Sequence, residues 1–232
     1  MHIIMTPLAQ KLRGNTSGLA MVEFALSLPV ILLMGLGGTE LAHMAMAVER
    51  VNQIAMLVAD NAARVRNTID ERDVNEIMTG AKLVGQDINF AAHGRIILSN
   101  IQNNPTNTGQ WIRWQRCAGT KNVSPSYNMY IDKGWQDTSL QTGVGPSTNK
   151  VLAAPGTIVM FVEVVYDYQP IVPIDYLGAR TFRVTQAFNV RDRVPASSTT
   201  STGAVDPAPP SDIKNQQNLT GPNVSDCALF SA

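Results

Sequence analysis

The sequence predicts an α+β protein in which a long N-terminal transmembrane helix continues outside the membrane. A second helix and an antiparallel sheet of about four strands are expected to follow it. Three observations support this fold: an almost uncharged apolar run near the N-terminus, apolar residues at helical spacing after it, and four segments with strand-like composition. A chain of 232 residues is long enough for one globular domain plus extra segments.

The transmembrane helix is predicted over residues 19–48, with an apolar centre at Phe24–Gly38. Its length suits a bilayer, which a helix of roughly 20 residues crosses. Lys11 and Arg13 precede it, so the positive-inside rule places residues 1–18 in the cytoplasm as a short leader. The alternative, a buried core helix, conflicts with a chain too short to cover so apolar a helix on every side.

Small and helix-bending residues lie inside this run. Pro29 is expected to kink the helix, because proline removes one backbone hydrogen bond and clashes with the preceding turn. Gly35, Gly37 and Gly38 form a small-residue patch where a second helix could approach closely.

Beyond the membrane, apolar residues recur at alternating three- and four-residue steps, which predicts that the helix continues. Such a stripe either packs on the protein's own domain or meets partner helices, and both interpretations stay open. The stripe consists of Val48, Val51, Ala55, Val58, Ala62, Val65 and Ile69.

A second helix is predicted to begin near Glu71. Thr68 and Glu71 have capping-box spacing, and Asp70 is an alternative N-cap. Its expected apolar face comprises Val74, Ile77, Met78, Ala81 and Val84.

Four strands are predicted after this helix, as an antiparallel meander with a helix laid over it. The segments are 95–102, 110–117, 157–168 and 181–191. Together with the helices they form an outer domain over residues 49–194. A tail rich in Pro, Ser, Thr and Asn follows at residues 195–232, with little to bury.

The two cysteines, Cys117 and Cys227, both lie on the predicted outer side, where an oxidising compartment favours a disulfide. Such a bond would tie the tail back to the domain. It would close a loop of about 110 residues and stabilise the fold by roughly 4 to 5 kcal/mol in the chain-entropy model. The alternative is two unrelated thiols.

Features of enzymes and nucleic-acid-binding proteins are missing from the sequence. The 18 basic and 18 acidic side chains balance, so no excess positive charge is available for phosphates. His2, His43 and His93 lie too far apart in the predicted topology to share a metal, and no phosphate-loop or nucleophile-elbow motif occurs. Glu163 and Asp167 lie on a strand pattern and are interpreted as a solvated face. We therefore expect no catalytic residue, cofactor or metal.

The start of the apolar run, Gly18-Leu19-Ala20-Met21-Val22-Glu23-Phe24, carries specific information. A carboxylate at the edge of a membrane helix is costly. Cleavage after Gly18 would create an ammonium group at Leu19, one helical turn from Glu23 or opposite it in a neighbouring subunit. The alternative is that Glu23 only extends to the cytoplasmic interface.

This segment resembles the cleavage motif of the TadE/TadG-like pseudopilins of tight-adherence (Tad/Flp) pilus systems, and it is most similar to the TadE pseudopilins. In that family a glycine, four mostly apolar residues and then Glu-Phe or Glu-Tyr precede a hydrophobic helix. Three segments carry the resemblance: 18–29 (GLAMVEFALSLP), 114–119 (WQRCAG) and 162–173 (VEVVYDYQPIVP).

The resemblance implies a role for each residue of the motif. Gly18 would be the last leader residue, Leu19 the mature N-terminus, Glu23 the carboxylate used in recognition or assembly, and Phe24 the aromatic residue that follows it. The implied partners are a prepilin peptidase, other pilins and pseudopilins, and the pilus assembly platform of the bacterial inner membrane.

The implied location is the inner membrane, with a cytoplasmic N-terminus and a periplasmic domain that could enter an extracellular pilus. Major Flp pilins are little more than the helix, whereas this chain adds a whole domain. With this added domain, the resemblance implies a minor pseudopilin that acts in pilus biogenesis or adhesion.

Three alternatives remain open, and the weakest of them is an envelope enzyme with a novel site. The chain could be an uncleaved, signal-anchored periplasmic adaptor of the secretion machinery. It could also be a secreted protein with a conventional signal peptide cleaved after Ala45-Met46-Ala47, although Glu40 and His43 interrupt the approach to that site.

Overall fold

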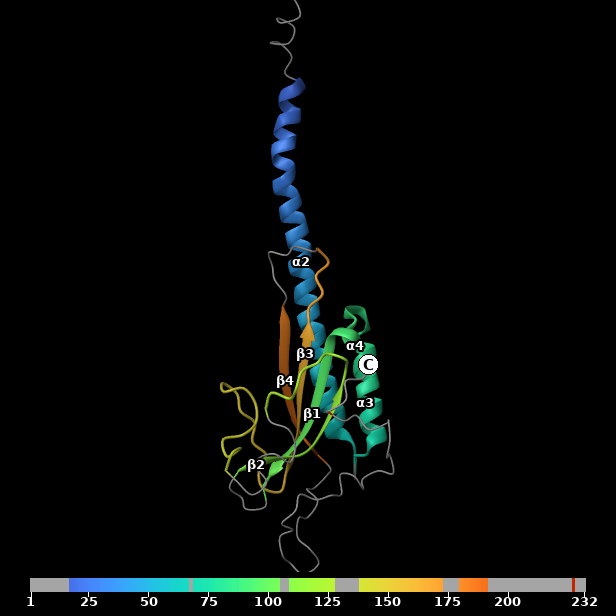
Figure 1. The fold of residues 1–232 in the computed structure, drawn as a ribbon, viewed down its shortest axis with the longest axis vertical. Coiled ribbons are helices and arrows are strands. Elements are labelled where there is room, and N and C mark those ends of the chain that lie inside the picture. Colours follow the sequence, from blue (N-terminus) through green and yellow to red (C-terminus); the bar gives the residue numbers. More distant parts are fainter. Residues whose placement is uncertain are drawn as a thin grey trace, which may run out of the picture. The chain divides into compact units, whose positions relative to one another are not determined.

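The computed structural model describes residues 17–66, 69–104, 109–127, 138–172, 180–191 and 227 (Figure 1). The chain divides into two compact units, one of residues 1–45 with 170–175 and the other of residues 46–169 with 176–232. Each unit is described by itself below.

The predicted long helix is confirmed as α2, Ser17–Arg64. Pro29 lies inside it, and the helix is assigned on both sides of that residue. The expectation that the helix extends to Ile69 is wrong, because α2 ends at Arg64. The next helix has its N-cap at Asp70 in an extended conformation, so the chain must leave helical geometry before that residue. Ile69 is nevertheless buried.

The second helix, α3, spans Glu71–Val84, as predicted. Asp70 is its N-cap and forms a reciprocal capping box with Asp73. The Asp73 amide donates to Asp70 Oδ1 at 2.9 Å, and the Asp70 amide donates to Asp73 Oδ2 at 2.9 Å. Thr68, the other predicted cap, lies outside the described residues.

The four strands are β1 (Gly94–Asn103), β2 (Gln110–Ala118), β3 (Ile158–Asp167) and β4 (Thr181–Asn189). Every neighbouring pair is antiparallel, and the order is β2-β1-β3-β4 (Figure 1). The predicted sheet is confirmed, but its meander order is wrong, because β1 lies between β2 and β3. The long segment between β2 and β3 allows the chain to cross from one edge of the sheet to the other side of β1.

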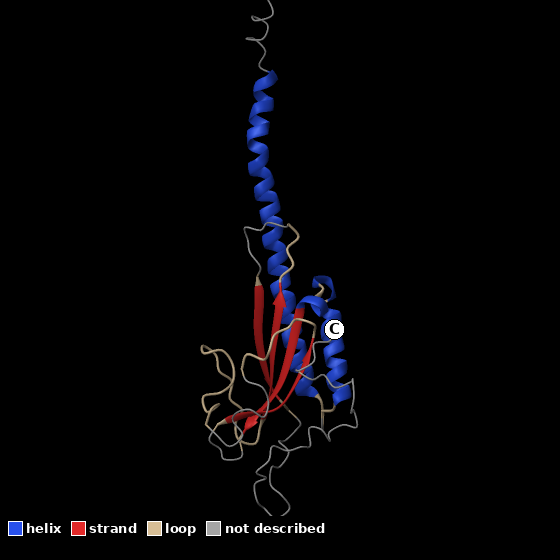
Figure 2. Ribbon diagram, in the orientation of Figure 1, coloured by secondary structure: helices blue, strands red, loops and turns tan. Residues whose placement is uncertain are grey.

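One face of the sheet packs against helices, which Figure 2 shows in blue behind the strands. A short 3-10 turn, Gln86–Ile88, and a short helix α4, Phe90–His93, follow α3. Phe90 stacks on Tyr166 with ring centroids 6.0 Å apart, and the Tyr166 hydroxyl donates to the Ile88 carbonyl at 2.7 Å. Burial raises the pKa of Tyr166, which keeps this hydroxyl a donor.

Within the second unit, α2 buries a broad apolar face. The residues of this face are at most 2% exposed, and they follow the i, i+3, i+4, i+7 and i+8 spacing of a core-facing helix. They are Val51, Ile54, Ala55, Val58, Ala59, Ala62 and Ala63. The outer part of the predicted stripe therefore packs on the protein's own domain.

The opposite face of the sheet is covered by loop segments between β2 and β3. The rings of Phe161 and Tyr127 meet edge to face, with their centroids 5.5 Å apart. Phe161 belongs to an apolar cluster with Ile101, Ile112, Leu140, Val144, Ala153 and Val159. The sheet is thus buried on both faces, and the edge strand β4 is its most exposed strand.

Candidate functional site

The first half of α2 carries an exposed apolar surface. The helix is long and apolar enough to cross a membrane, and none of its most apolar 18-residue window is buried. Leu19, Met21, Leu33 and Met34 are each more than 60% exposed. An apolar surface of this size needs a lipid or protein environment.

The candidate processing residues lie at the start of this surface. Gly18 is in the first turn of α2, and no atom lies within 4 Å of a Cβ placed on it. Leu19 and Phe24 are about 60% exposed, and Glu23 is also exposed. Leu19 and Glu23 are one turn apart on the same side of the helix. The leader, residues 1–16, lies outside the described residues.

Glu40 makes a buried contact that its sequence position did not predict, since it was considered only as a residue that interrupts a possible signal-peptide cleavage site. Its side chain is 2% exposed, and Oε2 accepts the backbone amides of Ile171 at 3.1 Å and Val172 at 3.0 Å. All three residues belong to the first unit. The sequence did contain a signal for this contact: a single carboxylate at the end of an apolar run needs a hydrogen-bond partner when it is buried.

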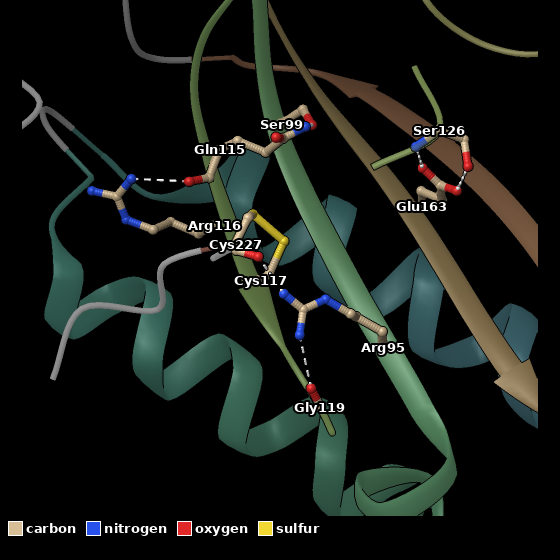
Figure 3. Close-up of a disulfide and its surroundings, with 9 residues drawn as sticks. All are labelled: Arg95, Ser99, Gln115, Arg116, Cys117, Gly119, Ser126, Glu163 and Cys227. Carbon is tan, nitrogen blue, oxygen red and sulfur yellow. Dashed lines mark hydrogen bonds between the residues drawn. A yellow bond between two sulfur atoms is a disulfide. The ribbon is translucent and has the colours of Figure 1, made fainter. Parts of the chain in front are cut away.

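In the second unit, the two cysteines form a disulfide (Figure 3). Cys227 packs on Cys117 and Ile97. Arg95, which is fully buried, donates to the carbonyls of Cys227 at 2.7 Å and Gly119 at 3.0 Å. Burial lowers the pKa of Arg95, and the two carbonyls compensate for lost hydration. The guanidinium thus joins the tail to the end of β2.

Glu163 contradicts the prediction of a solvated face. It is 1% exposed, accepts the Ser126 amide at 3.0 Å and hydroxyl at 2.6 Å, and is paired with Arg183 of β4. Figure 3 shows Ser126 directly over the carboxylate. Ser126 lies in the segment between β2 and β3, and the sequence had no signal that this segment folds back over β3.

Asp167, four residues further along β3, fits the prediction better, because its side chain is 42% exposed. It is paired with Lys121, and the Thr181 hydroxyl donates to it at 2.5 Å. Partial burial opposes ionisation, but the bonds from Lys121 and Thr181 outweigh it and hold the pKa of Asp167 below its ordinary value.

A second buried ion pair lies on the helix side of the sheet. Arg116 of β2 pairs with Glu71 in the first turn of α3, and both side chains are at most 10% exposed. Arg116 also donates to the Gln115 carbonyl at 3.0 Å (Figure 3). This pair attaches the start of α3 to the sheet.

The described residues contain no group of three or more His, Cys, Asp or Glu side chains placed to hold a metal. A cavity of about 340 Å³ opens beside β4 and the loop at Asn149 and Val151. Its lining combines apolar residues such as Phe161 and Ala187 with amides and a hydroxyl, and it includes no titratable side chain.

The fold and the exposed helix are consistent with one class of protein: an α+β domain that carries a single-pass membrane anchor near its N-terminus. Residues 18–64 match the family model described as TadE-like protein. This match confirms the predicted TadE-like resemblance over that segment and links it to pilus-associated proteins. It begins at Gly18 and ends where α2 ends. No curated protein and no solved structure matches the chain.

Proposed function

We propose that this protein is a minor pseudopilin of a Tad/Flp pilus system, cleaved after Gly18 by a prepilin peptidase and active in pilus biogenesis or adhesion. The observation that carries the proposal is the match of residues 18–64 to the TadE-like family, over a helix whose first half is apolar and exposed. The proposed role is assembly by helix packing and involves no catalysis.

The position of Glu23 supports the processing step. After cleavage, the ammonium of Leu19 would lie one turn from the Glu23 carboxylate, and the two opposite charges would offset the cost of placing either in the membrane. Both residues are exposed on α2, so the same charges could also pair with those of an adjacent subunit.

In the proposed topology, residues 1–18 are a cytoplasmic leader, and residues 19–48 cross the inner membrane, with residues 39–48 passing through its outer interface. Residues 49–194 form the periplasmic domain. Residues 195–232 form the tail. Lys11 and Arg13 support this orientation through the positive-inside rule, and the disulfide fits an oxidising periplasm. The partners would be other pilins, pseudopilins and the assembly platform, which α2 could meet through Gly35, Gly37 and Gly38.

The N-terminal residue and intact mass of the protein, taken from native membranes, test the proposal. We expect a chain that starts at Leu19 in the wild type and at Met1 when the prepilin peptidase is inactivated. A wild-type start at Met1 would instead indicate an uncleaved anchored adaptor. A start at Val48 would indicate a secreted protein.

Two glycine variants distinguish a loss of peptidase recognition at residue 18 from a general effect on folding. Gly18→Val should leave the chain uncut, whereas Gly35→Val should be processed normally. At both positions no atom lies within 4 Å of an added Cβ, so neither change disturbs the folded chain directly. Equal processing of the two variants would argue against Gly18 as the cleavage position.

A further inference from the structure

Glu40 of α2 binds the segment that follows β3, at residues 171 and 172. The buried carboxylate holds two consecutive backbone amides, those of Ile171 and Val172. Two consecutive backbone amides that donate to one side-chain oxygen fix the position of residues 170–172 along the helix. The side chain of Ile171 stays 57% exposed.

The helix sets the depth at which this contact occurs. Leu19 to Gly38 would span about 30 Å at 1.5 Å per residue, which matches the hydrocarbon thickness of a bilayer. Glu40 then lies about 3 Å beyond Gly38 along the axis, at the level of the lipid headgroups. Residues 170–172 are held at that same level by their bonds to Glu40.

The chemistry of the segment suits this environment. Pro170, Ile171 and Val172 carry no charge. On α2, Leu36 lies one turn before Glu40 and Leu41 directly follows it, and their side chains are 48% and 60% exposed. An exposed isoleucine held next to an exposed apolar helix is unfavourable in water and favourable at a lipid surface. The two apolar surfaces belong to one unit.

We propose that residues 170–172 form a second membrane contact, which Glu40 holds in the lipid–water interface at the outer end of the transmembrane helix. The partner is the bilayer itself, at the level of the headgroups and upper acyl chains. The proposal rests on the membrane-spanning part of the proposed function, and neither cleavage after Gly18 nor pilus assembly is needed for it.

The test is quenching of tryptophan fluorescence by brominated lipid, with the full chain in phosphatidylcholine vesicles brominated near the glycerol backbone. The variant Ile171→Trp keeps the backbone amide that binds Glu40. Its added fluorescence, after subtraction of the wild-type signal, should be quenched at least about twofold more than that of Leu152→Trp, because the bonds to Glu40 hold residue 171 near the depth of the bromine atoms. Leu152 is a matched control, since it is 56% exposed and lies in the other unit.

Equal quenching of the two variants would overturn the proposal. Flotation of the same vesicles distinguishes this result from a failure of membrane insertion: a chain that does not float with lipid refutes the anchor and the interfacial contact together. Quenching at residue 171 in a chain that is not processed in cells would leave the contact supported and refute the pseudopilin role.

A third variant tests the role of Glu40. Adding Glu40→Ala to Ile171→Trp should reduce the quenching, because the segment loses both bonds that hold it, whereas adding Glu49→Ala should not. Glu49 is an exposed glutamate on the same helix. Unchanged quenching with Glu40→Ala would refute Glu40 as the residue that holds the segment. Oxidation of Cys117 and Cys227 checks that the outer domain has folded in each variant.

Discussion

Glu163 and Asp167 show how the surroundings of one residue type decide its role. They lie four residues apart on the same face of β3, yet one carboxylate is buried with Arg183 and Ser126 and the other is partly exposed beside Lys121. A buried ionised group must be paired, whereas an exposed pair contributes little. Loss of a partner should therefore be far more costly at Glu163 than at Asp167.

Removal of the partner of Glu163 is expected to destabilise the protein. Arg183→Ala should lower the free energy of unfolding by about 2 to 3 kcal/mol, because it leaves a buried carboxylate without its counter-charge. Adding Glu163→Gln should recover part of that loss, since a neutral amide needs no counter-charge. Urea unfolding of the full chain in detergent measures both, with Arg191→Ala, an exposed residue just past β4, as the control. A double variant less stable than Arg183→Ala would contradict this account.

The pair of Asp167 and Lys121 is expected to depend on pH. The pKa of Asp167 is lower in the folded protein than in the unfolded chain, so the pair's stabilisation is present above the unfolded pKa and lost as pH falls through the folded value. The melting temperature of Lys121→Ala should therefore be below that of the wild type at pH 7, with the gap closing under acid conditions. A gap that is constant from neutral to acid pH would refute this assignment.

At the scale of elements, α2 serves two environments. Its first half exposes apolar side chains, whereas residues 51–63 bury theirs in the core of the second unit. Periodicity distinguishes the halves, because the first is apolar all round and the second has one apolar face. The two halves of α2 therefore suit different surroundings, an apolar environment for the first half and a domain core for the second.

The reversal between α2 and α3 depends on the cap at Asp70. Asp70→Ala should destabilise the protein by about 1 kcal/mol, because it leaves the Asp73 amide without its acceptor. The control Asp60→Ala removes only a surface pair with Arg64 and should cost less than about 0.5 kcal/mol. Thermal unfolding of both variants measures the difference. Equal losses would mean that the cap adds nothing beyond a surface charge.

At the scale of the whole molecule, the disulfide joins residues 110 positions apart and fixes Cys227 against the sheet. In the chain-entropy model, a loop of this length stabilises by roughly 4 to 5 kcal/mol. Cys117→Ala with Cys227→Ala should reduce the free energy of unfolding by an amount of this order. Reductant should destabilise the wild type similarly and leave the double variant unchanged. A wild type insensitive to reductant would show that the bond is not formed in the native protein.

Local patterns in the sequence determined much of this protein. The apolar run after Gly18, the start of α3 near Glu71 and the four strand segments were all predicted, because each depends on neighbours along the chain. The TadE-like resemblance was also local, since it rests on three short runs of consecutive residues, 18–29, 114–119 and 162–173, of which the family match covers the first. The disulfide partners were predictable because the chain contains only two cysteines.

Only the tertiary structure decided the features that depend on residues far apart in the sequence. It placed β1 between β2 and β3, folded the loop carrying Ser126 over Glu163, and brought Glu40 against the amides of Ile171 and Val172. A sequence pattern records the spacing of side chains along one segment, whereas burial and pairing depend on which distant segment covers it. The roles of these carboxylates therefore follow from long-range packing, while the helices and strands follow from the sequence itself.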